Sequence, residues 1–535
     1  MKIEQVNKIP YLKAICVIHV ATWFSTMVGL GQPGAFDASF RPNVTNPGFR
    51  PVWVTASYPD GSILIGGAHG FINENRSNMF SKLNPDGTPD EDFLPEFGFR
   101  HGEGDGAGNL GSIVVQPDGK IIVGNQITSF DGVPVNHVAR LNVDGTLDTS
   151  FDTGTGPMTV PRNHVIFSLS LQEDGKLIVG GVFTEWDGHE RNSLVRLNPD
   201  GSVDETFAPV FQAEPDSVIK IHKVMTLPDG KTWAAGKGFS HVNEAEVSTF
   251  FRLNPDGSLD ESFDAGSGAD ETVINAGRLP DGKVVIIGEF TEIDGQSRSR
   301  VAILEADGAL DSDFVGPEFK LEDGSGFPPD VQGLWVQEDG RMVIAGAFTS
   351  VDGYSRNHIV RLMPDGEVDT SFDPGTGFGL LSDFALERLG GAFLRNVIQE
   401  PSGDYIVVGA FESVDGNPQT GVARLFGDAN APAPRFRGVA SFSGGSEGMA
   451  MEPRIESLTV NERGNLVITV DPVEAGYQLE RTVDLESWDL VANAAELTER
   501  DGVYELLNWR AESTGFFRMV PPMPEAPEET EAGEE

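Results

Sequence analysis

A string of 12 residues recurs along the chain and limits the fold more than any other feature. Its clearest copy is RLNPDGSLDESF at 252–263, in which two short apolar runs flank Asn-Pro-Asp-Gly. This tetrapeptide favours a hairpin turn, because Pro presets the backbone of one turn residue and Gly accepts the strained conformation of another. Related strings lie at 82–93, 140–151, 196–207, 303–314 and 361–372. A hairpin that recurs in this way predicts a repeat architecture.

Two landmarks define the repeating unit: the Gly of an earlier Asp-Gly turn and the Phe that ends the string. From each Gly to the next Phe the spacing is 32 residues in five units and 33 in one, whereas from Phe to Gly it varies from 19 to 31. The first interval is therefore a rigid unit. Over 166–207 it contains four short runs typical of strands, IFSLSLQ, KLIVGGVF, NSLVRLN and SVDETF, joined by turns. We name these runs strands a to d.

One such four-stranded sheet cannot bury both faces alone, so neighbouring units must stack. Radial stacking gives a β-propeller, and a linear β-solenoid is the alternative. The chain ends favour the propeller, because the seventh unit stops after strand c near residue 428 and AFDASF at 35–40 can supply its missing strand. We predict an all-β fold: a seven-bladed β-propeller of four-stranded antiparallel blades over 32–428, closed by 35–40.

The repeated unit resembles the delta-60 repeat, a bacterial β-propeller repeat family. Its members read L-x-x-DGK-x-x-VGG-x-F followed by RLN-x-DG-x-LD-x-SF, and the resemblance covers roughly 35–428. Two departures stand out: FSHVNEAEVS replaces the usual F-T-x-x-DG at 239–248, and Ile303 replaces the Arg of the fifth unit. The resemblance implies a propeller and implies no particular activity.

The N-terminal segment has the plan of a secretory signal peptide. Lysines precede an apolar run at 14–30, and small residues follow, so we predict a signal peptide over 1–31 that is cleaved. An uncleaved membrane anchor is the alternative. Cys16, the single cysteine, lies inside this run, so the mature protein would have no disulfide. We expect the protein to be secreted or held at the cell surface.

The C-terminal part has a different composition. Residues 429–453 are rich in Pro, Gly and Ser and are predicted to be a linker. Short alternating apolar runs over 454–520 predict a small β module, which weakly resembles C-terminal attachment or sorting modules of secreted bacterial proteins. The tail at 521–535 holds six Glu residues and is predicted to be disordered.

The charge of the chain excludes some classes of partner. The chain has 38 basic and 82 acidic residues, a net charge of −44, and such a surface repels nucleic acid and anionic membranes. We expect no nucleic-acid partner, and no membrane contact beyond the signal peptide. The acidity suits solubility in an extracellular setting, or cation binding.

Charged residues recur at fixed places in the hairpin of strands c and d. Arginines on strand c and aspartates on strand d lie diagonally across the turn, within reach of a charge-assisted pair. We interpret them as one structural brace per blade; a ring of carboxylates for a cation is the alternative. Asp311 lacks its Arg, and closure of the ring requires Asp37 to lie near Arg424. The remaining members are Arg140, Arg196, Arg252, Arg361, Asp148, Asp204, Asp260 and Asp369.

Asp-Gly pairs recur in the loops between strands b and c. We interpret them as turns, and calcium binding through carboxylate and carbonyl oxygens is the alternative. The calcium candidates are Asp131, Asp187, Asp294, Asp352 and Asp415. No other cofactor is expected. His137 and His358 occupy a position where other units have Ser, Arg or Gly, so neither is expected to be catalytic.

The loops point to binding as the function. In an antiparallel meander, loops b–c and d–a lie at one end of the blade, opposite the tight turns, and loops on a rigid scaffold usually carry recognition. No familiar catalytic motif is present. We predict a monomeric, non-catalytic scaffold that binds a protein or polysaccharide through this variable-loop face. An extracellular glycan hydrolase or lyase with carboxylates at the channel mouth, and a structural surface protein, are the alternatives.

Overall fold

The computed structural model describes most of the repeat region and scattered strands outside it. The described residues are 33–42, 44–45, 51–67, 71–72, 75–76, 80–93, 98–100, 110–158, 164–322, 328–380 and 392–428, with strands at 18–19 and between 454 and 520. The chain forms two compact units, residues 32–431 and residues 1–31 together with 432–535. No helix occurs among the described residues, so the predicted all-β class is confirmed. The predicted linker and acidic tail lie outside them.

Among the described residues of the larger unit, seven large antiparallel sheets have three strands each, ordered from an inner through a middle to an outer strand. The inner strands are β3 (Val52–Ser57), β9 (Leu110–Val115), β15 (Val165–Leu171), β21 (Lys220–Thr226), β26 (Val273–Arg278), β32 (Asp330–Val336) and β38 (Phe393–Gln399). The middle strands are β4 (Ile63–Gly67), β10 (Ile121–Asn125), β16 (Leu177–Val182), β22 (Thr232–Lys237), β27 (Val284–Gly288), β33 (Met342–Ala347) and β39 (Tyr405–Ala410). The outer strands are β7 (Phe80–Leu83), β13 (Val138–Leu141), β19 (Leu194–Leu197), β25 (Phe250–Leu253), β30 (Val301–Leu304), β36 (Ile359–Leu362) and β42 (Val422–Leu425).

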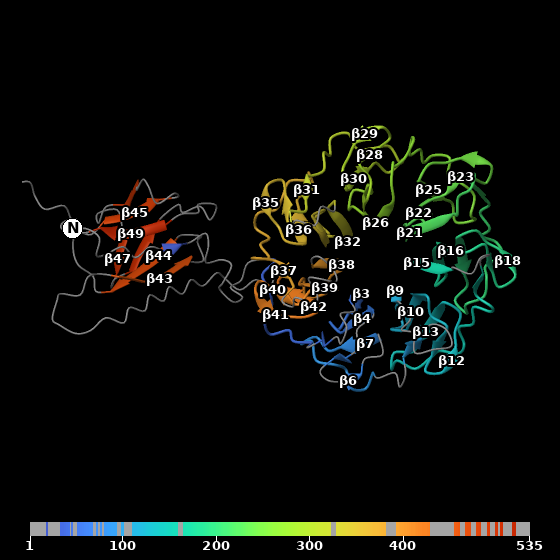
Figure 1. Cartoon of the computed structure of the whole chain (residues 1–535), viewed down its shortest axis with the longest axis horizontal. Helices are drawn as coiled ribbons and strands as arrows, with labels where there is room; N and C mark the ends of the chain where they lie inside the picture. Colours follow the sequence, from blue (N-terminus) through green and yellow to red (C-terminus); the bar gives the residue numbers. More distant parts are fainter. Residues whose placement is uncertain are drawn as a thin grey trace, which may run out of the picture. The chain divides into compact units, whose positions relative to one another are not determined.

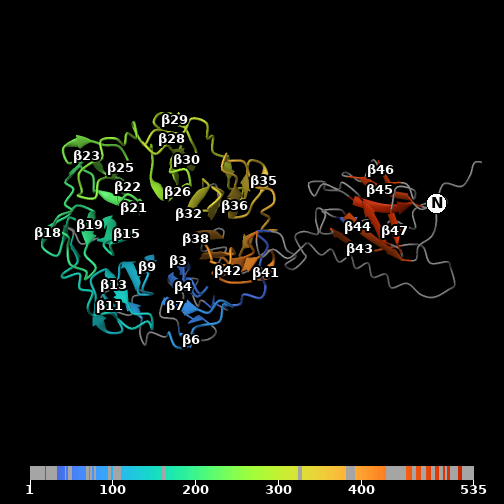
Figure 2. The ribbon, with the colours of Figure 1, turned by 180° about the vertical axis from the view of Figure 1, so that it is seen from behind.

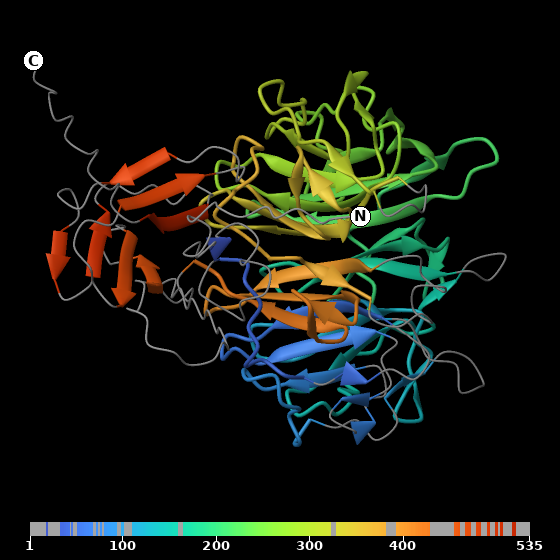
Figure 3. The same ribbon diagram turned by 60° about the vertical axis from the view of Figure 1, so that its left-hand side comes forward.

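The sheets are arranged as a ring around a common centre (Figures 1 and 2). Each inner strand packs beside the inner strand of the next sheet, and β38 packs beside β3. Figure 3 shows the last sheet, in orange, next to the first, in blue. The middle strands are almost wholly buried because a sheet lies on either side of them.

The hydrophobic core lies between consecutive sheets. Ile122 and Val138 of one sheet, for example, pack against Val179 and Leu197 of the next. The same packing joins the two ends of the repeat region, where Ile63 and Ile65 of β4 lie in one cluster with Ile406 and Val408 of β39. Apolar packing therefore continues around the whole ring.

The predicted fourth strand is wrong: the large sheets have three strands, and strand d contributes one bridged residue. Leu147 forms a single antiparallel bridge to Leu141, and Val203 does the same to Leu197. The next residue ends the pairing, because its carboxylate caps a turn. Asp148 accepts hydrogen bonds from the Ser150 amide at 3.0 Å and the Ser150 hydroxyl at 2.6 Å, so the chain turns away after one pair.

The N-terminal segment lies at this bridged position in the last sheet. Phe36 bridges Leu425, and the amide of Phe426 donates to the carbonyl of Ala35 at 2.9 Å. Arg424 Nε donates to Asp37 Oδ2 at 2.8 Å. Two segments almost 390 positions apart in the chain are thus joined by the contacts that occur within a hairpin in the other sheets.

Small sheets stand beside the large ones, where loops were expected. In six of them the hairpin of the b–c loop pairs with a strand from the preceding d–a connection, and in the seventh Ile293 makes a single bridge to Ala269. These sheets are β2 (Val44–Thr45), β5 (Phe71–Ile72) and β6 (Asn75–Arg76); β8 (Phe99–Arg100), β11 (Ser129–Phe130) and β12 (Val133–Pro134); β14 (Pro157–Met158), β17 (Glu185–Trp186) and β18 (His189–Glu190); β20 (Phe211–Ala213), β23 (Phe239–Val242) and β24 (Ala245–Glu246); β28 (Glu292–Ile293) and β29 (Gln296–Ser297); β31 (Phe319–Lys320), β34 (Ser350–Val351) and β35 (Tyr354–Ser355); and β37 (Phe378–Gly379), β40 (Ser413–Val414) and β41 (Asn417–Pro418). We call the end of the ring that carries them the loop face.

The second unit contains two four-stranded sheets. One is formed by β43 (Arg454–Val460), β44 (Leu466–Asp471), β48 (Val503–Leu506) and β47 (Thr498–Arg500), in that order. The other is formed by β1 (Ile18–His19), β49 (Phe516–Val520), β45 (Gln478–Thr482) and β46 (Asp489–Ala492). β1 lies within the predicted signal peptide and pairs with β49. Residues 454–520, predicted to form a small β module, therefore hold seven described strands.

One ion pair per sheet explains why the charged residues of the string recur at the same spacing in the repeats. The Arg on the outer strand donates its Nε to the Asp after the turn at 2.6–2.8 Å, in the pairs Arg140–Asp148, Arg196–Asp204, Arg252–Asp260, Arg361–Asp369 and Arg424–Asp37. Each guanidinium also stacks over the Phe that ends the string, at 4.5–5.0 Å. The Arg, Asp and Phe of the string thus form one cluster, which we call the brace.

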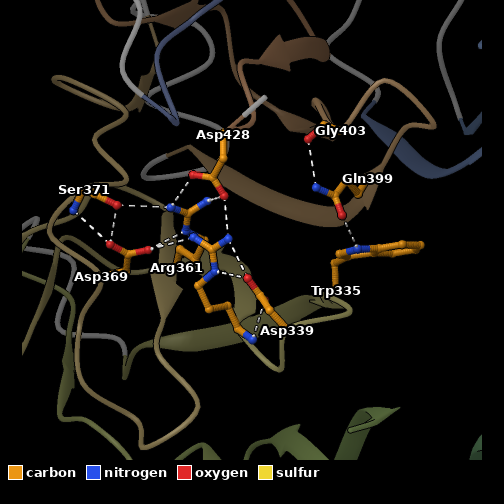
Figure 4. Close-up of polar contacts among 9 residues, drawn as sticks. Trp335, Asp339, Arg361, Asp369, Ser371, Gln399, Gly403 and Asp428 are labelled. Carbon is orange, nitrogen blue, oxygen red and sulfur yellow. Dashed lines mark hydrogen bonds and ion pairs between the residues drawn. The ribbon is translucent and has the colours of Figure 1, made fainter. Parts of the chain in front are cut away.

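In five of the seven sheets the brace also makes a contact with the next sheet. Arg140, Arg196, Arg252 and Arg424 donate a second N–H to a turn carbonyl of the neighbouring sheet at 2.5–2.6 Å. Arg361 instead binds the Asp428 carboxylate, with Nη2 2.9 Å from Oδ1 (Figure 4). The Lys of the Asp-Gly-Lys turn pairs with the same Asp in four sheets, so Asp311, which lacks an Arg, is held by Lys283 at 2.7 Å.

We predict that Arg196→Met lowers the free energy of unfolding by about 3 kcal/mol, because it removes one partner of a buried ion pair and leaves Asp204 with Lys176 alone. Urea denaturation measures the change. The matched control is Arg41→Met, since Arg41 is exposed and is expected to change stability by less than about 0.5 kcal/mol. Equal stability of the two variants would contradict the structural role of the brace.

Candidate functional site

The five predicted calcium candidates are placed in hairpin turns of the loop face. Asp131, Asp187, Asp294, Asp352 and Asp415 have φ between 45° and 49°, and the Gly after each also has positive φ. Two consecutive residues with positive φ are typical of a type I′ turn, which explains the Asp-Gly pairs.

The carboxylates of these aspartates fix the neighbouring d–a connection. Asp187 Oδ1, for example, accepts the amide of Thr155 at 2.8 Å, and Asp352 Oδ1 accepts the amide of Glu318 at 2.7 Å. In the fourth unit, where FSHVNEAEVS replaces the usual Asp-Gly loop, Asn243 has the same role. Its Oδ1 accepts the amide of Val210 at 2.9 Å. Within the described ranges, no group of three or more His, Cys, Asp or Glu side chains is placed to hold a metal ion.

The position shared by His137 and His358 is defined by its backbone conformation and not by its side chain. Both residues have positive φ, at 67° and 74°, as do Ser193, Arg300 and Gly421 in three other sheets. A left-handed conformation at the entry to the outer strand therefore explains why this position is occupied by such different side chains.

A cavity of about 980 Å³ lies along the centre of the ring and is lined by residues of all seven inner strands. Each inner strand shifts its register by one residue, near its start, against its middle strand. The residues at the shift all line the cavity, and we call them the bulge ring: Trp53, Gly111, Phe167, His222, Ile274, Gln332 and Arg395. Because the d–a connections enter the inner strands here, the bulge ring lies at the loop-face end of the cavity.

The cavity lining reverses the charge of the protein as a whole. It includes the cations Lys220, Lys223, Lys237, Arg278 and Arg395 but only one carboxylate, Glu289, among the described residues that line it. The whole chain has more than twice as many acidic as basic residues, 82 against 38. Anions are therefore attracted to the channel and repelled by the rest of the surface.

Aromatic rings and unsatisfied polar atoms accompany these cations. The Arg395 guanidinium lies over Trp53, 4.6 Å from the ring centre, and His222 stacks on Phe167 at 4.9 Å. Within the described part of the chain, Trp53 Nε1, His222 Nε2 and Arg395 Nε are buried without a hydrogen-bond partner. Burial and the neighbouring Lys237 and Lys220 lower the pKa of His222 to about 4, so its imidazole is neutral at pH 7.

Trp335 is held in place where it lines the same cavity. Its Nε1 donates to Gln399 Oε1 at 3.3 Å, and Gln399 Nε2 donates to the carbonyl of Gly403 at 2.8 Å (Figure 4). The indole is therefore oriented by a chain of hydrogen bonds that continues into the next sheet.

A second cavity of about 790 Å³ lies between the sheets of β15 and β21 on the loop face. Its lining is mainly apolar and includes Phe167, Phe211 and Val218. It shares Phe167, Lys220 and Lys237 with the central cavity, so the two are adjoining parts of one site. We call the second cavity the loop-face groove.

Sequence reasoning missed this site, although one signal was present. Strand β21 reads KIHKVMT, with two lysines and a histidine, whereas the corresponding strands β15 and β3 read VIFSLSL and VWVTAS. Two lysines and a histidine in one inner strand, against a single charged residue in each of β26, β32 and β38, indicate a wall of the channel that differs from the rest.

A buried carboxylate with a raised pKa lies at the other end of the last sheet. Glu400 is in the turn between β38 and β39, and burial raises its pKa to about 7, while Arg424 opposes the shift. Gln116, Gln172 and Gln337 occupy the corresponding turns of three other sheets. Glu400 therefore stands where three other sheets have an uncharged amide, and we interpret the position as structural.

Comparison with known families agrees with this architecture. Segments 59–93, 116–151, 172–207, 227–263, 279–314, 337–372 and 400–428 match the family described as "Domain of unknown function (DUF5122) beta-propeller". The chain carries β-propeller repeats. The resemblance to a propeller repeat family is confirmed to that extent, and the match does not bear on the name delta-60. No curated protein matches the sequence.

Solved structures resemble the chain only distantly. Virginiamycin B lyase from Staphylococcus aureus is 12% identical with a TM-score of 0.40, over 71% of this chain and 97% of that one. The extracellular domain of BT4673 from B. thetaiotaomicron is 11% identical with a TM-score of 0.37, over 85% of this chain and 47% of that one. PorZ, a surface component of the type-IX secretion system of Porphyromonas gingivalis, is 11% identical with a TM-score of 0.23, over 86% and 77%. At these scores none transfers an activity to this chain.

We predict that Glu400→Gln raises stability at neutral and alkaline pH and leaves it unchanged in acid. The folded-state pKa of about 7 exceeds the ordinary 4.5, so the native protein loses stability as the pH rises from 4.5 through 7. The gain above pH 7 is up to about 3 kcal/mol, since one pKa unit corresponds to about 1.4 kcal/mol. Urea titrations across this range measure it. Exposed Glu338→Gln is the control, and parallel pH profiles for both variants would refute the assignment.

We predict that calcium and a chelator leave the melting temperature unchanged. Each turn aspartate already uses a carboxylate oxygen to accept a backbone amide, so turn formation does not require a cation. Differential scanning calorimetry with excess calcium chloride and with EDTA makes the comparison. A reproducible rise with calcium would show that these turns are metal sites, because a ligand that binds only the folded state raises the melting temperature.

Proposed function

We propose that this protein is a non-catalytic binding protein that acts outside the cytoplasm, as a monomer, and takes its ligand at the loop face. The single observation that supports the proposal most is a joined pair of cavities, one of about 980 Å³ along the centre of the ring and one of about 790 Å³ on the loop face. Both lie within or close to the size range of ligand sites in proteins. A polysaccharide or protein partner of the predicted kind would enter through the loop-face groove and reach the central cavity.

The lining of the central cavity supports binding over glycan hydrolysis. Hydrolysis of a glycosidic bond usually requires two carboxyl groups on either side of the bond. Glu289 is the single carboxylate among the described residues that line this cavity, and cations outnumber it. We therefore favour a binding scaffold over a hydrolase or lyase, and over a purely structural surface protein.

The architecture behind this proposal is a seven-bladed propeller in which residues 35–40 complete the last blade. The bridge from Phe36 to Leu425 and the ion pair from Arg424 to Asp37 support it. Secretion is also part of the proposal, and its support is the lysine-flanked apolar run at 14–30. None of the described residues forms a helix long and apolar enough to cross a membrane.

We predict that Ala213→Trp abolishes ligand binding without loss of stability, because Ala213 is exposed and lines the loop-face groove, which an indole would fill. A thermal-shift panel of neutral and acidic oligosaccharides identifies a ligand through the rise in melting temperature that it causes. The matched control is Gln212→Trp, one residue away, exposed and outside the groove lining. Ligands that bind Ala213→Trp as well as the native protein would place the site elsewhere and contradict the proposal.

A further inference from the structure

We infer that the central cavity binds an acidic sugar, a short oligosaccharide whose carboxylates lie among Lys220, Lys223, Lys237 and Arg395. The inference rests on the proposed function and names the ligand class and the place in the channel where it binds. Four observations support it: the reversed charge of the lining, the unusual position of Lys223, the pairing of two lysines across one sheet, and the unsatisfied donors of β3 and β38 on the opposite side of the channel.

Lys223 lies where five of the other six inner strands have a small or amide residue and β3 has Val54. The residue after the register shift is Ser112 in β9, Ser168 in β15 and Asn275 in β26. Ser112 Oγ accepts the amide of Leu169 at 3.2 Å and Ser168 Oγ accepts the amide of Val224 at 3.1 Å, so both serines join neighbouring inner strands. A lysine cannot accept such a bond.

Lys223 is also costly to the folded protein. Burial alone lowers its pKa to about 8, and no carboxylate of the described residues offsets the effect. A partly buried cation without a partner destabilises a fold. Groups that weaken the fold in this way are common at binding and catalytic sites, where a ligand supplies the missing partner.

Two more lysines meet at the same wall. Lys220 and Lys237 are direct cross-strand partners in β21 and β22, and like charges in this arrangement repel each other. Lys237 lies 3.7 Å from Glu271, but both side chains are largely exposed, so this pair is screened by solvent. An anion between the two ammonium groups would relieve the repulsion.

The other lining groups favour a sugar over a simple anion. Trp53 Nε1 and Arg395 Nε are donors without partners in the described part of the chain, and the lining adds the side-chain amide of Asn396. Hydroxyl groups of a sugar ring can satisfy such donors and amides, while aromatic faces pack against its C–H groups. The net charge of −44 repels a long polyanion, so a short acidic oligosaccharide fits better than an extended acidic polymer.

Isothermal titration calorimetry with trigalacturonate tests the inference on the full chain. The neutral match is the fully methyl-esterified trimer, which has the same rings without the charges, and inorganic sulfate is the simple-anion probe. We expect the acid to bind, the ester and sulfate to bind at least about tenfold more weakly, and added salt to weaken the acid. Lys223→Met should weaken the acid about tenfold and raise the melting temperature, whereas exposed Lys320→Met should change neither.

The outcomes separate this inference from the proposed function. Equal affinity for acid and ester would overturn the inference and leave a neutral glycan site. Sulfate that binds as tightly as the acid would overturn the assignment to a sugar. Acid binding that is unchanged in Lys223→Met and in the double variant Lys220→Met, Lys237→Met would place the anion elsewhere. No binding of either trimer would also overturn the inference, while the groove variants continue to test binding at the loop face.

Discussion

The ion pair between the outer-strand arginine and the aspartate after the turn is the interaction on which the ring depends. Arg196 shows its three parts: Nε binds Asp204 of its own sheet, Nη1 binds the carbonyl of Pro255 in the next sheet, and the guanidinium covers Phe207. Burial raises the pKa of Asp204, but the Thr206 and Lys176 hydrogen bonds outweigh it and keep the carboxylate charged. Since all five arginines reach the next sheet, five of the seven junctions of the ring are held by the same local contact.

A ring held in this way leaves its centre free to vary. The middle strands are buried and the braces lie at the turns opposite the loop face, so substitutions in the inner strands leave both intact. Lys223 illustrates the consequence, because a serine at this place in β15 joins neighbouring strands and a lysine gives up that bond. We interpret this loss of local stability as a consequence of forming an anion site. The other six sheets of the ring provide enough stability to tolerate it.

The propeller could be predicted from the sequence because turn chemistry is local. Pro-Asp-Gly specifies a hairpin wherever it occurs, and the nearly constant spacing from Gly to Phe reports a rigid unit. The fourth strand could not be predicted, since Asp148 ends the pairing through a capping bond that alternating residues do not reveal. The small sheets pair segments that are separated by connections of variable length. The cavity is lined by seven strands that are far apart in the sequence. Such contacts are visible only in three dimensions, although the lysines of KIHKVMT were a signal.

We infer above all that this acidic protein has a cationic channel that binds an acidic sugar. A crystal structure of the protein with trigalacturonate tests this claim most directly. We predict that a carboxylate of the ligand lies within hydrogen-bond distance of Lys223 Nζ and that its sugar ring lies beside the bulge ring. A ligand bound on the face of the Asp-Gly-Lys turns, or a central cavity that holds ordered water while the ligand lies elsewhere, would contradict it.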